Sequence, residues 1–183
     1  YFTPPRVEVM IDAIPADIRY FKKSGVESFF TEAETILYGN PQNFYDIQLW
    51  LGYQMLNNPE QNEEKLIATY MKHHYGPAAE NMTDLLNMIR KAVRKEKKGL
   101  FYISNPVREY QTGDFLKNTY DMLQKAKSQT QPDTPYRLRV EKELITPIAV
   151  ILYNPQLKTG LDRKTLLKEY QALRTAQIEA YCD

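Results

Sequence analysis

The sequence is poor in the residues that build disulfide-bonded, metal-binding and membrane-spanning proteins. It holds one cysteine, Cys182, and two histidines among 183 residues. A single cysteine excludes an internal disulfide and a cysteine-rich metal cluster. No apolar run approaches the roughly 18 residues that a membrane span needs, and no stretch reads as a signal peptide. The sequence therefore predicts no membrane span, and it indicates no metal and no other cofactor.

Glycine is scarce as well, with seven residues, whereas Leu, Lys, Glu, Ala and Gln are plentiful, which favours helix. Neither charge dominates, because 24 basic side chains stand against 23 acidic ones. This balance gives no electrostatic reason to expect a nucleic-acid partner. One local run is basic: Arg90, Lys91, Arg94, Lys95, Lys97 and Lys98. It falls at an expected helix C-terminus, where cations suit the helix dipole, so we interpret it as a solvated helix end rather than an anion site.

From residue 58 onward the patterns are helical throughout, which predicts a mainly α multi-helix bundle. Five helices are expected, over about 58–76, 77–99, 112–127, 134–153 and 162–181. Start signals are Asn58 with Pro59, Pro77, Thr134 with Pro135, and Asp162. Pro147 lies inside the fourth of these helices and is expected to kink it or to end its regular hydrogen bonding.

The first 57 residues read differently. "PADIRYFKKSG" predicts a short helix with Pro15 at its first position and Gly25 just past its end. "VESFFTEAE", residues 26–34, has strand character. The next helix, over about 43–58, is apolar almost all round and is therefore expected to be buried between layers. We predict two parts: a helix–strand–helix α/β remnant at 1–57 and a helical domain at 58–183.

"HHYGP", residues 73–77, places the two histidines at a helix–helix corner. Gly76 can take the left-handed conformation that closes a helix, and Pro77 can begin the next one. Adjacent helical residues diverge by about 100°, so His73 and His74 are not expected to share a metal ion. Replacing Gly76 by Ala is expected to cost on the order of 1 kcal/mol through the backbone alone.

Three segments carry a family resemblance: "LNNP" at 56–59, "HYGPAA" at 74–79 and "YRLRVEKELITPIAVIL" at 136–152. They resemble the C-terminal region of a bacterial family that is grouped as domain of unknown function 4838 and is related to endo-β-N-acetylglucosaminidases. The resemblance runs from about residue 17 to 181. The sequence departs from the family pattern at His74, where a second aromatic residue is usual.

The resemblance implies a glycoside hydrolase whose (β/α)₈ barrel precedes this chain, with residues 1–57 as the last unit of that barrel. It also implies an oligosaccharide or glycan as partner and export of the parent protein to the periplasm or cell surface. The catalytic acids would lie on earlier barrel strands, so no catalytic residue is assigned in this chain. The chain alone is expected to be inactive.

Glu32 and Glu34 follow the expected strand directly, where barrel enzymes carry their sites. Residues i and i+2 of a strand point the same way, so both carboxylates can face one pocket. Tyr38, in the same loop, could stack on a sugar ring. We predict substrate-binding roles for Glu32, Glu34 and Tyr38. The alternatives are that the acids cap or solvate the loop and that the tyrosine packs.

Two functions from different classes stay open. In the first, the chain is the helical portion of a carbohydrate-active enzyme, supporting the barrel and its cleft. In the second, it is a stand-alone helical binding or scaffold domain without catalysis. A large exposed apolar patch around Phe29, Phe30 and Trp50 would favour the first reading, because it would mark a contact with the barrel. A closed bundle would favour the second.

Overall fold

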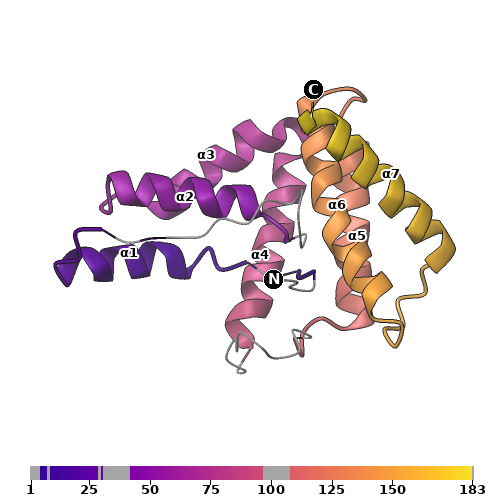
Figure 1. The fold of residues 1–183 in the computed structure, drawn as a ribbon, viewed down its shortest axis with the longest axis horizontal. Coiled ribbons are helices and arrows are strands. Elements are labelled where there is room, and N and C mark those ends of the chain that lie inside the picture. The colour runs from indigo at the N-terminus through magenta and orange to yellow at the C-terminus, as the bar shows by residue number, and fades with distance from the viewer. Residues whose placement is uncertain (1–4, 8, 29, 31–41, 97–107, 183) are drawn as a thin grey trace.

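A computed structural model describes residues 5–7, 9–28, 30, 42–96 and 108–182. These residues form α-helices joined by irregular segments and one 3₁₀ turn (Figure 1). The elements are α1 Ala13–Lys23, α2 Tyr45–Asn57, α3 Glu63–Tyr75, η1 Gly76–Ala78, α4 Ala79–Lys95, α5 Gly113–Ser128, α6 Pro135–Tyr153 and α7 Arg163–Cys182. The prediction of a mainly α fold is confirmed.

The helices form two groups that meet at α4. In Figure 1, α1, α2 and α3 project to one side as a layer, while α4 to α7 stand upright beside them. Consecutive helices pack against each other from α1 to α4 and again from α4 to α7, and α6 also contacts α3. The contact of α6 with α3 therefore joins the two groups directly.

Three of the predicted helix starts are closed by a local side chain. Thr112, Thr134 and Asp162 each accept a hydrogen bond from the backbone N–H three residues later, at 3.2, 3.2 and 2.8 Å. Helix α6 continues through Pro147 to Tyr153, so Pro147 does not end the helix. Pro147 has no backbone N–H, so one hydrogen bond inside α6 is missing. Residues 143–151 of α6 are all buried, and packing against α3, α5 and α7 stabilises the helix at this point.

Helix α3 begins four residues later than predicted. Asn58 is the C-cap residue of α2 and not the N-cap of α3; its side-chain oxygen accepts from the Glu60 N–H at 3.1 Å, and Asn62 caps α3 instead. The cause lies in α1, because the Arg19 guanidinium donates to the carbonyls of Pro59 and Gln61, both at 3.0 Å. Those carbonyls face a charged donor and are not free to begin a helix at residue 59.

The predicted α/β remnant finds no support in the described residues. Val26 to Ser28 and Phe30 form no strand, and the rest of the expected strand lies outside the described residues. The nearest approach to a sheet there is an isolated parallel bridge between Arg6 and Gln42. Helix α1 also begins at Ala13, so Pro15 is its third residue rather than its first, although Gly25 takes the expected positive φ of 75°.

The extended segment before α1 is held against the helices by its side chains and by one hydrogen bond to Gln48, and not by pairing with a strand. Val7, Val9 and Ile11 are buried in the core, and the Met10 N–H donates to the Gln48 side chain at 2.7 Å. One contiguous cluster of buried apolar residues includes these side chains together with residues from every helix. The division at residues 57 and 58 remains a prediction.

Candidate functional site

The sugar-binding residues predicted from the sequence, Glu32, Glu34 and Tyr38, lie outside the described residues. Their predicted roles remain predictions. The described residues present a different feature that is open to solvent, a groove between α1 and α2.

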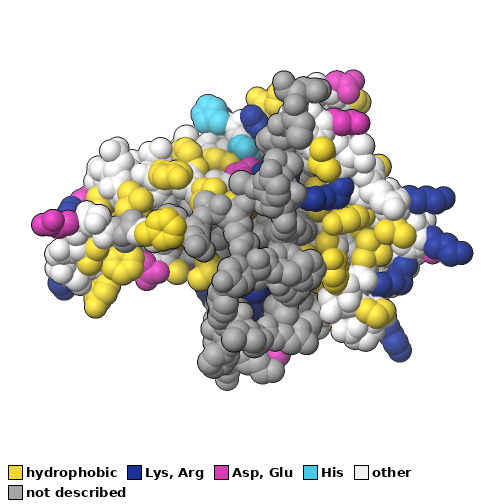
Figure 2. Space-filling view, in the orientation of Figure 1, with side chains coloured by type: hydrophobic (Ala, Val, Ile, Leu, Met, Phe, Trp, Pro, Cys, Tyr) yellow, Lys and Arg dark blue, Asp and Glu magenta, His cyan; other side chains and the backbone are white. Residues whose placement is uncertain are grey.

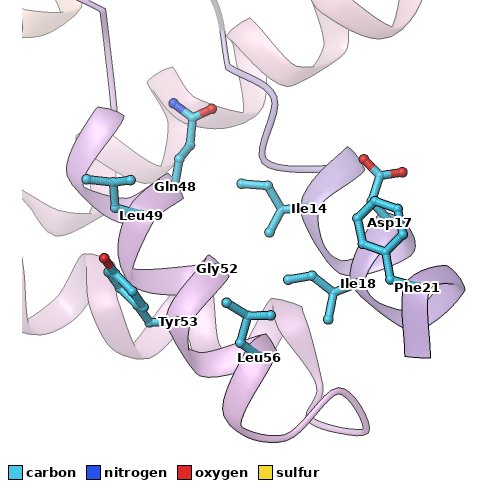
Figure 3. A pocket seen from close by; sticks show the side chains of 9 residues that line it. All are labelled: Ile14, Asp17, Ile18, Phe21, Gln48, Leu49, Gly52, Tyr53 and Leu56. Carbon is cyan, nitrogen blue, oxygen red and sulfur yellow. The ribbon is translucent and has the colours of Figure 1, made fainter. Parts of the chain in front are cut away.

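The groove has a volume of about 290 Å³ and a mostly apolar lining. Figure 3 shows its two walls, with α1 on one side and α2 on the other. The lining residues are Ile14, Asp17, Ile18 and Phe21 of α1 and Gln48, Leu49, Gly52, Tyr53 and Leu56 of α2. An open pocket of this composition suits the apolar face of a partner better than a small polar molecule.

This groove corrects the expectation that α2 is buried on every side. Ile47, Leu51 and Met55 are fully buried, but Tyr53 is 65% exposed and Leu56 is 43% exposed. Helices α1 and α3 pack against α2, and the groove side is left open to solvent. Counting apolar residues around the helix predicted burial correctly for one face and wrongly for the other.

Further apolar side chains lie exposed in the same part of the molecule. Tyr20 is 67% exposed on α1, Val26 is 44% exposed just after it, and Phe30 is 84% exposed. Figure 2 shows hydrophobic side chains gathered over α1 and α2. Trp50 does not belong to this surface, because it is half-buried and packs at 5.2 Å between ring centroids against Tyr70. Phe29 lies outside the described residues.

A second cluster of polar side chains is completely enclosed. Glu143 of α6 accepts hydrogen bonds from the backbone N–H of Phe44 at 2.8 Å, the Asn43 amide at 2.9 Å and the Tyr75 hydroxyl at 2.9 Å. Phe44 is the residue before α2 and has a positive φ of 55°, without a side-chain cap. The carboxylate of Glu143 therefore serves as a cap for α2 and holds the end of α3 through Tyr75.

Burial governs the ionisation of this cluster. Removal from water raises the pKa of Glu143, against the lowering effect of the Phe44 and Asn43 hydrogen bonds. Burial also raises the pKa of Tyr75, and the neighbouring Glu143 carboxylate raises it further. With Asn43, Phe44, Tyr75 and Glu143 all within 4% of full burial, no substrate reaches the carboxylate. The cluster is a structural anchor.

The "HHYGP" segment is a helix–helix corner, as predicted, but Pro77 lies in the 3₁₀ turn η1 and the next α-helix begins at Ala79. Gly76 has a positive φ of 51° and joins α3 to η1. The ring of Tyr136 lies against it, such that a Cβ on residue 76 would meet the ring at 2.8 Å. His74 stacks on Tyr70 with ring centroids 4.5 Å apart, whereas His73 is exposed. Within the described ranges, no three His, Cys, Asp or Glu side chains gather as a metal site would require.

Arg90 corrects the interpretation of the basic run as a solvated helix end. Its guanidinium bonds Asp12 at 2.8 Å and Glu64 at 3.1 Å, and its side chain is only 9% exposed. Arg94 joins Asp12 from the other side at 2.7 Å. Burial alone would raise the pKa of Asp12, but the hydrogen bonds from Arg94 and Arg90 outweigh it and lower the pKa. Arg90 thus ties α1 and α3 to α4.

The sequence contains a signal for the groove and a signal for the buried Glu143 cluster. Gly52, in the middle of α2, is a poor helix former that the apolar count ignored. Glu143 is a single carboxylate on the stripe of Val140, Leu144 and Pro147, which the helical period places toward the core. A charge on a buried stripe indicates a partnered polar group.

None of the described helices is both long enough and apolar enough to cross a lipid bilayer.

Comparison with known proteins gives one match. No curated protein and no solved structure matches the chain. The match is to the family model described as "Domain of unknown function (DUF4838)" and covers residues 3–87, somewhat under half of the 183 residues. The matched segment contains both walls of the groove, all of α3 and the corner at Gly76. Residues 3–87 are therefore similar to the DUF4838 family.

Proposed function

We propose that the chain is the helical portion of a carbohydrate-active enzyme, a glycoside hydrolase that acts on N-acetylglucosamine-containing glycans. In this proposal the helices support a catalytic barrel carried by the same polypeptide. The observation that carries it is the exposed apolar surface over α1 and α2, which lies within the family-matched segment. Apolar surface of this kind marks a contact with another protein part.

The positions of the carboxylates among the described residues favour a role in supporting the barrel over a catalytic role. Glycoside hydrolysis needs two carboxyl groups about 5 to 9.5 Å apart across the scissile bond, or one acid with the substrate's own acetamido group. The groove has a single carboxylate, Asp17. Glu143 is enclosed, and Asp12 is paired with Arg90 and Arg94. The chain alone is therefore expected to be inactive.

Glu32, Glu34 and Tyr38 enter the proposal as residues that contact the glycan. Carboxylates accept hydrogen bonds from sugar hydroxyls, and a tyrosine ring can stack on a sugar face. Replacing Glu32 or Glu34 by Gln, or Tyr38 by Ala, should weaken glycan binding by the complete enzyme.

The second reading, a stand-alone binding or scaffold domain, has less support. It requires a closed bundle, and the open α1–α2 surface argues against one.

The test compares two proteins: the chain of 183 residues and the product of the complete open reading frame that encodes it. Each is incubated with N-acetylglucosamine oligosaccharides and with released N-glycans, and new reducing ends are measured. The proposal expects turnover by the longer product alone. Turnover by the short chain that is lost in Glu32→Gln or Glu34→Gln would overturn it, and so would an inactive longer product.

A further inference from the structure

The two walls of the α1–α2 groove have the same periodicity. On α1 the lining residues fall at positions i, i+3, i+4 and i+7, namely Ile14, Asp17, Ile18 and Phe21. On α2 they fall at the same spacing, namely Leu49, Gly52, Tyr53 and Leu56, with Gln48 beside them. This is the spacing by which one helix presents a stripe to another helix. Two such stripes side by side form a seat for a third helix.

Gly52 lies at the centre of the α2 wall (Figure 3). A glycine inside a helix costs about 1 kcal/mol relative to alanine, so a close approach of some neighbour usually justifies it. Among the described residues there is no such neighbour: a Cβ on residue 52 would meet only the Ile14 side chain, at an ordinary 3.9 Å. The space above Gly52 is therefore open to a side chain that comes from outside the described residues.

Asp17 gives the groove a charge. It is the one carboxylate in the lining given by the described residues, is exposed, and makes no hydrogen bond or ion pair with other residues in the described parts of the chain. A carboxylate at the edge of an apolar contact favours a lysine or arginine on the partner, since a charge left without a partner there loses hydration.

We propose that the α1–α2 groove binds one amphipathic helix, which sets a large apolar side chain over Gly52 and a lysine or arginine beside Asp17. The inference rests on the proposed function for the source of this helix, the catalytic part of the same polypeptide. Both stripes lie in the family-matched segment, and the lining contains no residue of the C-terminal helices.

The test measures amide hydrogen exchange in peptides from α1 and α2. In the complete product of the open reading frame, exchange over residues 13–23 and 45–57 should be at least tenfold slower than in the chain of 183 residues, because docking suppresses local opening. Gly52→Phe places a ring in the groove and blocks docking of the partner helix. This variant of the complete product should therefore exchange as fast as the short chain. Ala68→Phe, which adds the same ring at an exposed site of α3, should leave the exchange slow. Circular dichroism confirms that both variants are folded.

The charge is tested with a second pair of variants. Asp17→Lys should accelerate exchange over the same peptides in the complete product, and Asp84→Lys, at an exposed site of α4, should not. Equal exchange rates in the short chain and the complete product would overturn the inference. A dimer of the short chain that Gly52→Phe dissociates would overturn it too, because a second copy would then occupy the groove.

The failures of the two proposals differ. Glycan hydrolysis without protection of α1 and α2 contradicts only the docking inference. Protection without hydrolysis contradicts only the proposed activity.

Discussion

The Tyr75 hydroxyl donates a 2.9 Å hydrogen bond to the carboxylate of Glu143, which lies 68 residues further along the chain. This bond joins the end of α3 to the middle of α6. Both side chains are buried, so the bond forms away from water, where a lost donor is not replaced by solvent.

Removing the Tyr75 hydroxyl should destabilise the protein clearly. Tyr75→Phe leaves the buried Glu143 with one donor fewer, and we expect a loss of about 1.5 to 3 kcal/mol in the free energy of unfolding. Urea titration followed by circular dichroism measures it. Tyr53→Phe is the control, because Tyr53 is 65% exposed and its hydroxyl can bond water. Equal stability of Tyr75→Phe and the unsubstituted chain would contradict the role of the cluster.

Gly76→Ala should cost more than the backbone alone predicts. Besides the positive φ, the new Cβ would meet the Tyr136 ring at 2.8 Å, so this half-buried ring must move aside. We expect a loss of roughly 2 to 4 kcal/mol. Gly25→Ala isolates the backbone contribution, because Gly25 has a φ of 75° with nothing within 4 Å of its Cβ position. That variant should lose about 1 kcal/mol. Similar losses of stability in Gly76→Ala and Gly25→Ala would show that the Tyr136 ring moves aside at little cost.

The stability of the protein should fall as the pH drops from about 6.5 toward 4 through His74. Burial, with the neighbouring Arg139 charge, lowers the pKa of His74 to about 4 from the ordinary 6.5. The unfolded chain therefore binds a proton in this pH range that the folded chain excludes. His74→Phe keeps a ring on Tyr70 without a titrating group, and its stability should depend less on pH in this range. Urea midpoints at half-unit pH steps for the two proteins provide the measurement.

Glu143 should act in the opposite direction. Its pKa is raised by burial, so its folded form favours the proton, and stability is lost as the pH rises above about 4.5 through the folded pKa. Glu143→Gln removes this titration. The stability difference between Glu143→Gln and the unsubstituted chain should therefore shift in favour of the variant as the pH increases. A difference that stays constant with pH would indicate that Glu143 does not change protonation in this range.

Arg90 and Arg94 contact the same carboxylate but should differ in importance. Arg90→Ala leaves Asp12 and Glu64 without a buried donor between α1, α3 and α4, and we expect a loss of roughly 2 kcal/mol or more. Arg94 is 60% exposed, and Arg94→Ala should cost less than about 1 kcal/mol. Thermal unfolding of the two variants compares them directly. An equal loss of stability in the two variants would show that the burial of Arg90 does not strengthen its contribution.

The helix starts that the sequence predicted well are those whose caps are local. Thr134 and Asp162 bond N–H groups three residues away, so the signal lies within one short window. The start of α3 was wrong because Arg19, 40 residues earlier, bonds the Pro59 carbonyl. A window of neighbouring residues cannot contain such a partner.

The same limit applies to the candidate site. The apolar residues of α2 indicate that some surface covers each face, but not whether that surface belongs to this chain. Ile47 and Met55 meet the core, while Tyr53 and Leu56 meet the groove. Periodicity placed these residues on a helix, and only the packing of α1 beside α2 divides them between core and groove.

The long reach of Glu143 has a consequence for the order of folding during synthesis. The backbone N–H of Phe44 and the side-chain amide of Asn43 donate to a carboxylate that is synthesised 99 and 100 residues later. A ribosome that adds roughly 5 to 20 residues per second takes several seconds or more to cover this distance. Until α6 emerges, the nascent α2 lacks its cap and the face of α3 that packs against α6 lies uncovered. The family-matched segment is therefore a candidate client for chaperones that hold unfinished chains.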